Sequence, residues 1–313
     1  MLGRLDALQR RRAILGFPYA VGKRYTEDHG GWLGSLVAYY GFFSLYPLVV
    51  SFATVATWLF KDEPDTLQRV LEALWSQLPF VSDELFGTSV QDKVQDLSGQ
   101  KWVLVLSLLV ALWGGAGVVR VLQDTVNTIW GVPRYRRPGF AAKLLRGMVV
   151  FALLGAGIVG TAVVAGVTVA VDLPIIAAVG AAVANVALAT GIALVFYHLV
   201  IGTQVRTREL LPGALITAVG AYGMTLLGGL YVQHVIARMT GLYGPFASTI
   251  GLFAYVSLIV QIFVIGTEVN VVRCKRLWPR ALGAELGPPD LRALELSMGR
   301  EALAPPGGGA AVS

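Results

Sequence analysis

Long apolar stretches separated by shorter polar ones dominate this chain. A helix needs about 20 apolar residues to cross roughly 30 Å of hydrocarbon, and stretches of about that length or more occupy residues 32–60, 102–119, 147–171, 173–201, 211–231 and 242–272. They are too long for membrane strands and lack the alternation of strands. Every backbone amide in lipid must also find its partner within its own segment. The pattern therefore predicts an all-α fold, a polytopic membrane helical bundle with about six transmembrane helices.

The polar intervals divide the chain into three regions. Residues 1–31 form a basic N-terminus, residues 32–277 the six-span membrane domain, and residues 278–313 a tail rich in Pro and Gly that is expected to be disordered. Within the membrane domain, the 61–101 interval predicts amphipathic helices over 65–78 and from residue 82. These helices either pack over the bundle, which we favour, or lie on the outer leaflet.

The distribution of charge orients the bundle. Only 14% of the residues are charged and the net charge is +6. Lys and Arg gather at both chain ends and in the intervals after the second and fourth apolar stretches, whereas the 61–101 interval is mainly acidic. The positive-inside rule then places both termini in the cytoplasm and the 61–101 interval outside it. The anionic lipids of an inner leaflet attract such basic segments.

Motifs of common catalytic, metal-binding and nucleic-acid-binding sites are missing from the sequence. The chain has one cysteine, Cys274, and three histidines far apart, which argues against a disulfide framework and a metal site. Phosphate-binding loops, nucleophile elbows and zinc-protease motifs are absent, and no basic, aromatic surface offers a platform for nucleic acid. We therefore expect no metal, no cofactor, no nucleic-acid partner and no enzymatic activity.

An acidic residue near the end of the last apolar stretch is the sharpest candidate for function. Glu268 lies in the sequence Gly-Thr-Glu-Val-Asn, two residues before Asn270. A carboxylate in such a stretch costs several kcal/mol unless it is paired, hydrated or protonated. It either lines a polar cavity or couples protons, or else it is a helix-end carboxylate that pairs with Arg273 or another basic residue.

A second candidate is a hydroxyl-bearing stripe in the first apolar stretch. Tyr40, Ser44 and Pro47 recur at helical spacing, and Tyr39 adjoins them. Proline inside a helix frees a carbonyl that a hydroxyl or water can satisfy. The stripe is either part of a transport path or a structural kink with tyrosines bonded inside the bundle.

The third candidate follows the second apolar stretch. Arg120, Asp124 and Asn127 share one side of a predicted helix over 120–130, and Arg120 can pair with Asp124 across one turn. This side is either functional or a solvated helix face.

Three of these segments resemble the YihY/BrkB family of bacterial inner-membrane proteins. The resemblance rests on residues 34–50 (GSLVAYYGFFSLYPLVV), 122–138 (LQDTVNTIWGVPRYRRP) and 242–270, which run from LYGPFASTIGLFAY to GTEVN. It covers about residues 15–277. The last stretch has fewer Trp and Tyr near its middle than the family usually shows.

The resemblance implies a plasma-membrane protein with about six spans that is associated with envelope integrity and serum resistance. Export of lipids or envelope precursors has been suggested for the family. An older label, ribonuclease BN, fits poorly, because a metal-dependent nuclease needs His and Asp ligands that the chain lacks.

These observations leave three hypotheses. The first is a transporter or flippase of a lipid or envelope-related molecule, with a polar cavity open to the membrane. The second is a structural or scaffold protein of the envelope that works through residues 61–101. The third is a membrane enzyme, for which the sequence offers only Glu268 and Asp124 as acid and base. The expected partners are membrane lipids, with a second copy of the chain as a further candidate.

Overall fold

The architecture is helical wherever the chain is described. The computed structural model describes residues 13–60, 62–76, 117–137, 174–201, 205–231, 246–282 and 286–301, together with residues 105 and 238 and short pieces between 139 and 160. Within these residues every regular element is a helix, which confirms the all-α part of the predicted fold class. Their bounds are α2 Ala13–Glu27, α3 Gly30–Leu59, α4 Pro64–Ser76, the short 3-10 helix η1 Arg134–Arg136, α8 Pro174–Val200, α9 Thr207–Tyr231, α11 Phe246–Cys274 and α12 Pro288–Glu301. Residues 117–129 are also helical.

Three helices carry stretches that are long and apolar enough to cross a membrane. These stretches are Val179–Val200 in α8, Thr207–Leu227 in α9 and Thr249–Cys274 in α11. They correspond to the fourth, fifth and sixth spans predicted above. The first predicted span coincides with α3 along its backbone, whereas the second and third lie mostly outside the described residues. The count of six therefore stays a prediction.

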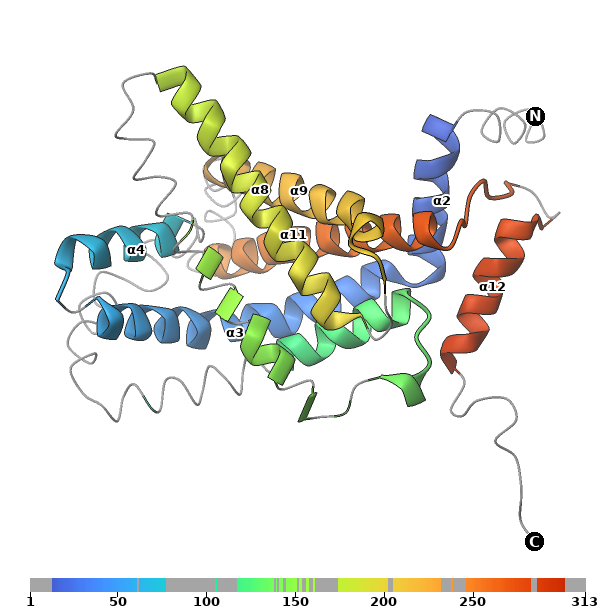
Figure 1. Cartoon of the computed structure of the whole chain (residues 1–313), viewed down its shortest axis with the longest axis horizontal. Coiled ribbons are helices and arrows are strands. Elements are labelled where there is room, and N and C mark those ends of the chain that lie inside the picture. The colour runs from blue at the N-terminus through green and yellow to red at the C-terminus, as the bar shows by residue number, and fades with distance from the viewer. Residues whose placement is uncertain are drawn as a thin grey trace, which may run out of the picture.

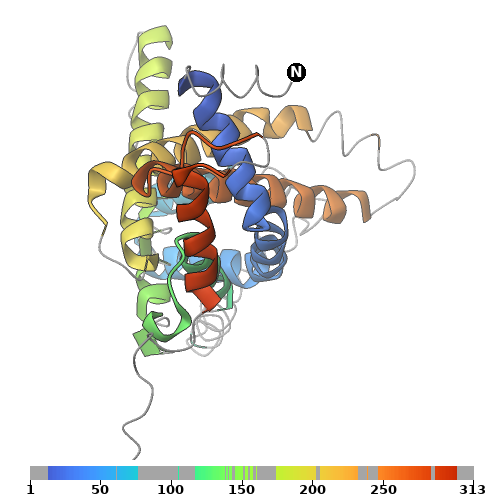
Figure 2. The same cartoon turned by 90° about the vertical axis from the view of Figure 1, so that its right-hand side faces the viewer.

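The long helices pack side by side in the order α8, α9, α11, α3 (Figure 1). The start of α3, the ends of α8 and α11 and the start of α9 lie at one end of the bundle, where α2 and α12 also pack. Figure 2 views this end and shows α12 beside α2. The helix α4 lies at the opposite end, after α3, and its bounds agree with the amphipathic helix predicted over 65–78.

Glycines allow the close approach of α9 and α11. A Cβ added to Gly213 would collide with the backbone oxygen of Gly266, and one added to Gly266 would lie 2.7 Å from the backbone oxygen of Gly213. Further along the same pair, Gly220 faces the side chain of Ile262. Small residues that bring helix backbones together are common at helix contacts in membranes. Because lipid tails are as apolar as the helices, the hydrophobic effect does not drive helices together there.

The expectation of a wholly disordered tail is wrong for residues 288–301, which form α12. The Gly-Pro-Pro sequence at 287–289 suggested a linker, yet proline is favoured in the first helical turn. The carboxylate of Asp290 reaches back to accept a hydrogen bond from the backbone N–H of Gly287, 3.1 Å away, which supplies a partner to one of the free amides at the start of the helix. This helix begins where the composition alone indicated disorder.

Candidate functional site

The helix α11 presents two different polar faces near its C-terminal end. Gln261 and Glu268, seven residues apart, share the face toward α2 and α3, and the Glu268 side chain is fully buried. Thr267 and Asn270, also fully buried, belong to the face toward α8 and α9. A helix that is apolar in composition therefore carries buried polar groups on both sides at one end.

The first face connects α11 to α2. The hydroxyl of Tyr25 lies 2.7 Å from Oε1 of Gln261, and Nε2 of Gln261 donates to the backbone carbonyl of Gly31 at 3.2 Å. Burial raises the pKa of Tyr25, and the negative charge of Glu268 raises it further. Because Glu268 follows Gln261 by seven residues, it lies on the side of α11 that makes this contact.

The second face is a small network of hydroxyl groups at the junction of three helices. Tyr197 of α8 places its hydroxyl 3.3 Å from Oγ1 of Thr217 in α9 and 3.4 Å from Oγ1 of Thr267 in α11. One turn further along α11, Oδ1 of Asn270 accepts a hydrogen bond from the backbone N–H of Gly213 at 2.8 Å. Direct hydrogen bonds between hydroxyls and amides of neighbouring spans hold this junction together.

Asn127 caps the C-terminal end of α8. Its Nδ2 donates to the backbone carbonyl of Val200 at 3.0 Å and to that of Gln123 at 2.7 Å. The last carbonyls of a helix lack partners within the helix, so this side chain replaces one missing bond. Asn127 is fully buried, whereas Arg120 is exposed, so the three-residue side predicted as one face has two environments.

Asp124, the remaining member of that side, lies 3.8 Å from Nη1 of Arg137. The guanidinium of Arg137 also donates to the hydroxyl of Thr128 and the carbonyl of Val132. It therefore joins residues 117–129 to the turn that follows. The Arg120–Asp124 pairing predicted from spacing stays a prediction.

The hydroxyl stripe of α3 is divided between two environments. Tyr39 and Tyr40 are 53% and 42% exposed, whereas Ser44 is buried and its hydroxyl donates to the carbonyl of Gly41 at 2.9 Å. Tyr40 also lies against residue 117, since a Cβ added to Gly117 would approach its ring at 3.5 Å. The backbone at Pro47 is helical, but its side chain lies outside the described part of the structure.

The structure therefore distributes the predicted residues over three places. Glu268 and Asn270 lie at the end of α11 beside α2 and α9, Asn127 lies at the end of α8, and Tyr40 lies on α3 against residue 117. The sequence pattern does not single out Tyr25, Tyr197, Thr217, Gln261 and Thr267 as functional residues. For Gln261, the seven-residue spacing to Glu268 was an available signal. The others belong to helix junctions that appear only after folding.

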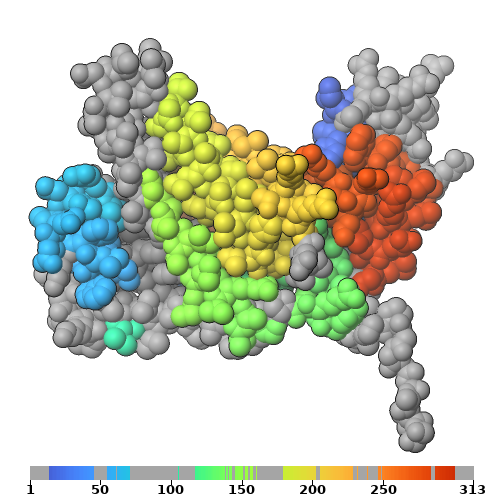
Figure 3. All heavy atoms as spheres, in the orientation of Figure 1, coloured from blue at the N-terminus to red at the C-terminus, as the bar shows by residue number. Residues whose placement is uncertain are grey.

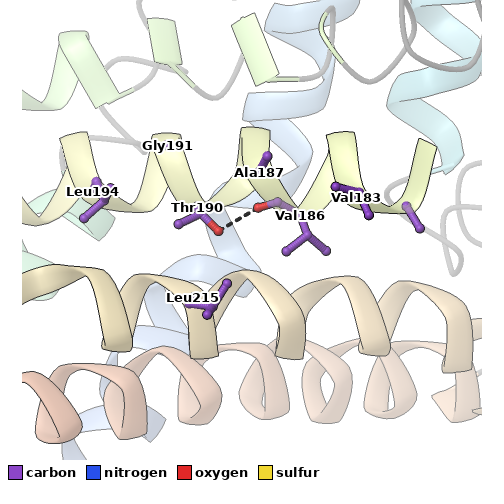
Figure 4. A pocket seen from close by; sticks show the side chains of 8 residues that line it. Val183, Val186, Ala187, Thr190, Gly191, Leu194 and Leu215 are labelled. Atoms are coloured by element: carbon purple, nitrogen blue, oxygen red, sulfur yellow. Dashed lines mark hydrogen bonds between the residues drawn. The ribbon is translucent and has the colours of Figure 1, made fainter. Parts of the chain in front are cut away.

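An open groove lies on α8, away from these polar groups (Figure 4). Its volume is about 590 Å³, and it is lined by one stripe of α8 and by Leu215 of α9. The stripe contains Ala182, Val183, Val186, Ala187, Thr190, Gly191 and Leu194. The Thr190 hydroxyl donates to the carbonyl of Val186 at 2.6 Å, so the groove is apolar in character. None of the candidates from the sequence lines it.

The helices and their buried polar ends define an α-helical membrane protein of several spans. The chain belongs to the family described as virulence factor BrkB, whose sequence model matches residues 21–284. This confirms the resemblance drawn from the three motifs. The chain is also 27% identical over 124 residues to an uncharacterized protein of Dickeya dadantii (strain 3937), and the match covers 38% of this chain and 37% of that relative. No solved structure matches the chain.

Proposed function

We propose that this chain is a bacterial inner-membrane transporter that moves a lipid or an envelope-related amphiphile, with Glu268 as the group whose charge changes during transport. The observation that carries the proposal is the full burial of Glu268 within the span of α11. Ionisable side chains inside membrane spans are expensive and commonly mark substrate or proton pathways.

The surroundings of Glu268 connect its charge to a helix contact. The face that it shares with Gln261 meets Tyr25 of α2, and the charge of Glu268 acts on the hydroxyl of Tyr25. Neutralising Glu268 would remove this effect and change the electrostatics between α2 and α11. A proton-coupled transporter requires that binding of a proton alters a helix contact, and the proposal assigns this role to the contact between α2 and α11.

The orientation that accompanies this proposal places the end containing α2 and α12 in the cytoplasm. The basic residues of the N-terminus, of the segment that includes η1 and of α12 support this assignment through the positive-inside rule. The helix α4 then lies on the outer side. Membrane lipids are the partners that the proposal requires, and association of two copies is compatible with it.

The test is lipid translocation by the purified protein in liposomes. The probe is fluorescent NBD-phosphatidylethanolamine, whose exposure in the outer leaflet is measured by dithionite quenching with and without a pH gradient. We expect protein-dependent translocation that the Glu268→Gln variant loses. Glu295→Gln, which removes an exposed carboxylate of α12, serves as the matched control and should behave like the wild type.

Either of two results would overturn the proposal. The first is translocation no faster than in protein-free liposomes, and the second is unchanged translocation in Glu268→Gln. If in addition both Glu268 and Ser44 tolerate replacement in cells while changes in the 61–101 interval damage the envelope, the scaffold hypothesis replaces the transporter.

A further inference from the structure

We infer that the groove between α8 and α9 binds an anionic phospholipid, with an acyl chain along the apolar stripe of α8 and the phosphate at the end that carries His198, Arg206 and Arg208. The inference rests on the groove and its charged end. It stands whether or not the bound lipid is the transported molecule.

The groove has the shape and chemistry that an acyl chain requires. Figure 4 shows Val183, Val186, Thr190 and Leu194 in succession along α8, with Leu215 of α9 across from them. The volume of about 590 Å³ lies in the range of small-molecule sites. Because the Thr190 hydroxyl already donates to the carbonyl of Val186 in its own helix, it does not require a polar partner from an occupant of the groove. A flexible hydrocarbon chain can fill such a space without leaving a polar group unpaired.

The stripe continues directly into a basic, polar end. His198 follows Leu194 by four residues on α8, and its Nε2 lies 3.1 Å from Oγ1 of Thr207, at the first turn of α9. Along α9, Leu211 precedes Leu215 by four residues, and both are 47% exposed. The apolar lining of both helices therefore leads to the same end of the groove. Figure 3 shows α8 and α9, in yellow-green to light orange, beside one another on the face toward the viewer.

Two exposed arginines give that end its preference for an anion. Arg206 and Arg208 flank Thr207 and are both exposed, while the neighbouring acid, Glu209, is exposed as well. Arginine binds phosphate through two parallel N–H donors. Each basic residue at a membrane surface strengthens the binding of anionic lipids about fivefold. An occupant that is apolar along its length and anionic at one end satisfies both parts of the surface, and an anionic phospholipid has this form.

The experiment is photo-crosslinking of a phosphatidylglycerol with a diazirine in its acyl chain to the protein in lipid nanodiscs. We expect adducts concentrated on peptides of α8 and α9 that line the groove. Phosphatidylglycerol should compete for the site more strongly than phosphatidylcholine. Arg206→Gln combined with Arg208→Gln should reduce this preference roughly 30-fold, as two contributions of the size given above predict.

A pair of glycine variants separates groove binding from general lipid contact. A Cβ added to Gly191 or to Gly223 meets nothing within 4 Å, so both helices should accept leucine. Gly191→Leu fills the groove and should abolish the localised adducts. Gly223→Leu, a residue of α9 that does not line the groove, should leave them unchanged.

Three results would each overturn the inference. They are adducts spread evenly over the lipid-facing helices, adducts that persist in Gly191→Leu, and equal competition by the two phospholipids. The binding assay needs no translocation. A protein that binds at the groove but fails the liposome test refutes the proposed transport alone, whereas one that translocates without groove adducts refutes the lipid site alone.

Discussion

The carboxylate of Asp290 holds the first turn of α12 against the end of the bundle, and Asp290→Asn should release this helix. Asp290 accepts hydrogen bonds from Nε of Arg280 at 2.6 Å, Nζ of Lys23 at 3.1 Å and the backbone N–H groups of Ala281 and Gly287, each at 3.1 Å. Asparagine keeps the size of the side chain but removes its charge and turns one acceptor into a donor. The change therefore acts on α2, the 280–281 segment and α12 together.

The size of the expected loss follows from the lowered pKa of the Asp290 carboxyl. Burial alone would raise the pKa of Asp290, but the bonds from Arg280, Ala281, Lys23 and Gly287 outweigh it and lower the pKa from 3.8 to about 2. Lowering the pKa from 3.8 to about 2 corresponds to about 2 kcal/mol in favour of the charged form. Removal of one partner of a buried pair costs about 3 to 5 kcal/mol. Arg280 retains Glu27 at 2.6 Å, so we expect about 2 to 3 kcal/mol.

Hydrogen exchange of the α12 amides measures this cost directly. A loss of about 2 to 3 kcal/mol corresponds to a roughly 30- to 150-fold fall in protection if α12 exchanges by local detachment. Glu295→Gln is the control, because Glu295 is exposed on the same helix and should leave protection unchanged. Equal protection of α12 in the wild type and Asp290→Asn would refute the assigned role of the carboxylate.

Three further predictions concern the same end of the molecule and the junction of α9 with α11. Because the pKa of Asp290 is lowered in the folded state, docking of α12 should be complete above about pH 4 and weaken as the pH falls toward about 2, which distances between spin labels on α2 and α12 would report. Gly213→Ala should lower stability by about 1 to 3 kcal/mol or more, because its Cβ meets backbone of Gly266 that cannot rotate away. Gly22→Ala, whose Cβ meets nothing within 4 Å, should instead stabilise α2 by up to about 1 kcal/mol, and thermal unfolding in detergent compares the two.

The apolar pattern predicted the three membrane-length helices that the described residues contain, but not the junctions between them. Length and composition predicted the spans that became α8, α9 and α11, since an apolar segment of this length can pair its backbone groups within itself only as a helix. The pattern also identified Glu268, whose burial follows from its position in an apolar run. It missed α12, because Pro288 and Pro289 are typical both of a linker and of a first helical turn. It also missed the Tyr197–Thr217–Thr267 network. Its members lie on three helices, and they come within hydrogen-bond distance only when those helices pack together.

The helix α2 connects α12 to the polar face of α11, and a double-mutant cycle measures this connection. Arg24 is buried beside Asp28 at 2.8 Å and donates to the carbonyl of Ala293 in α12, while the next residue, Tyr25, bonds Gln261 in α11. One rigid turn of helix thus carries both contacts, so displacement of either partner should shift the other. For Asp290→Asn combined with Tyr25→Phe, we expect unfolding free energies that depart from additivity by about 0.5 kcal/mol or more, whereas independent sites add within about 0.3 to 0.5 kcal/mol. Strict additivity would mean that α2 holds the two contacts without transmitting strain between them, and that a change at α12 leaves the environment of Glu268 undisturbed.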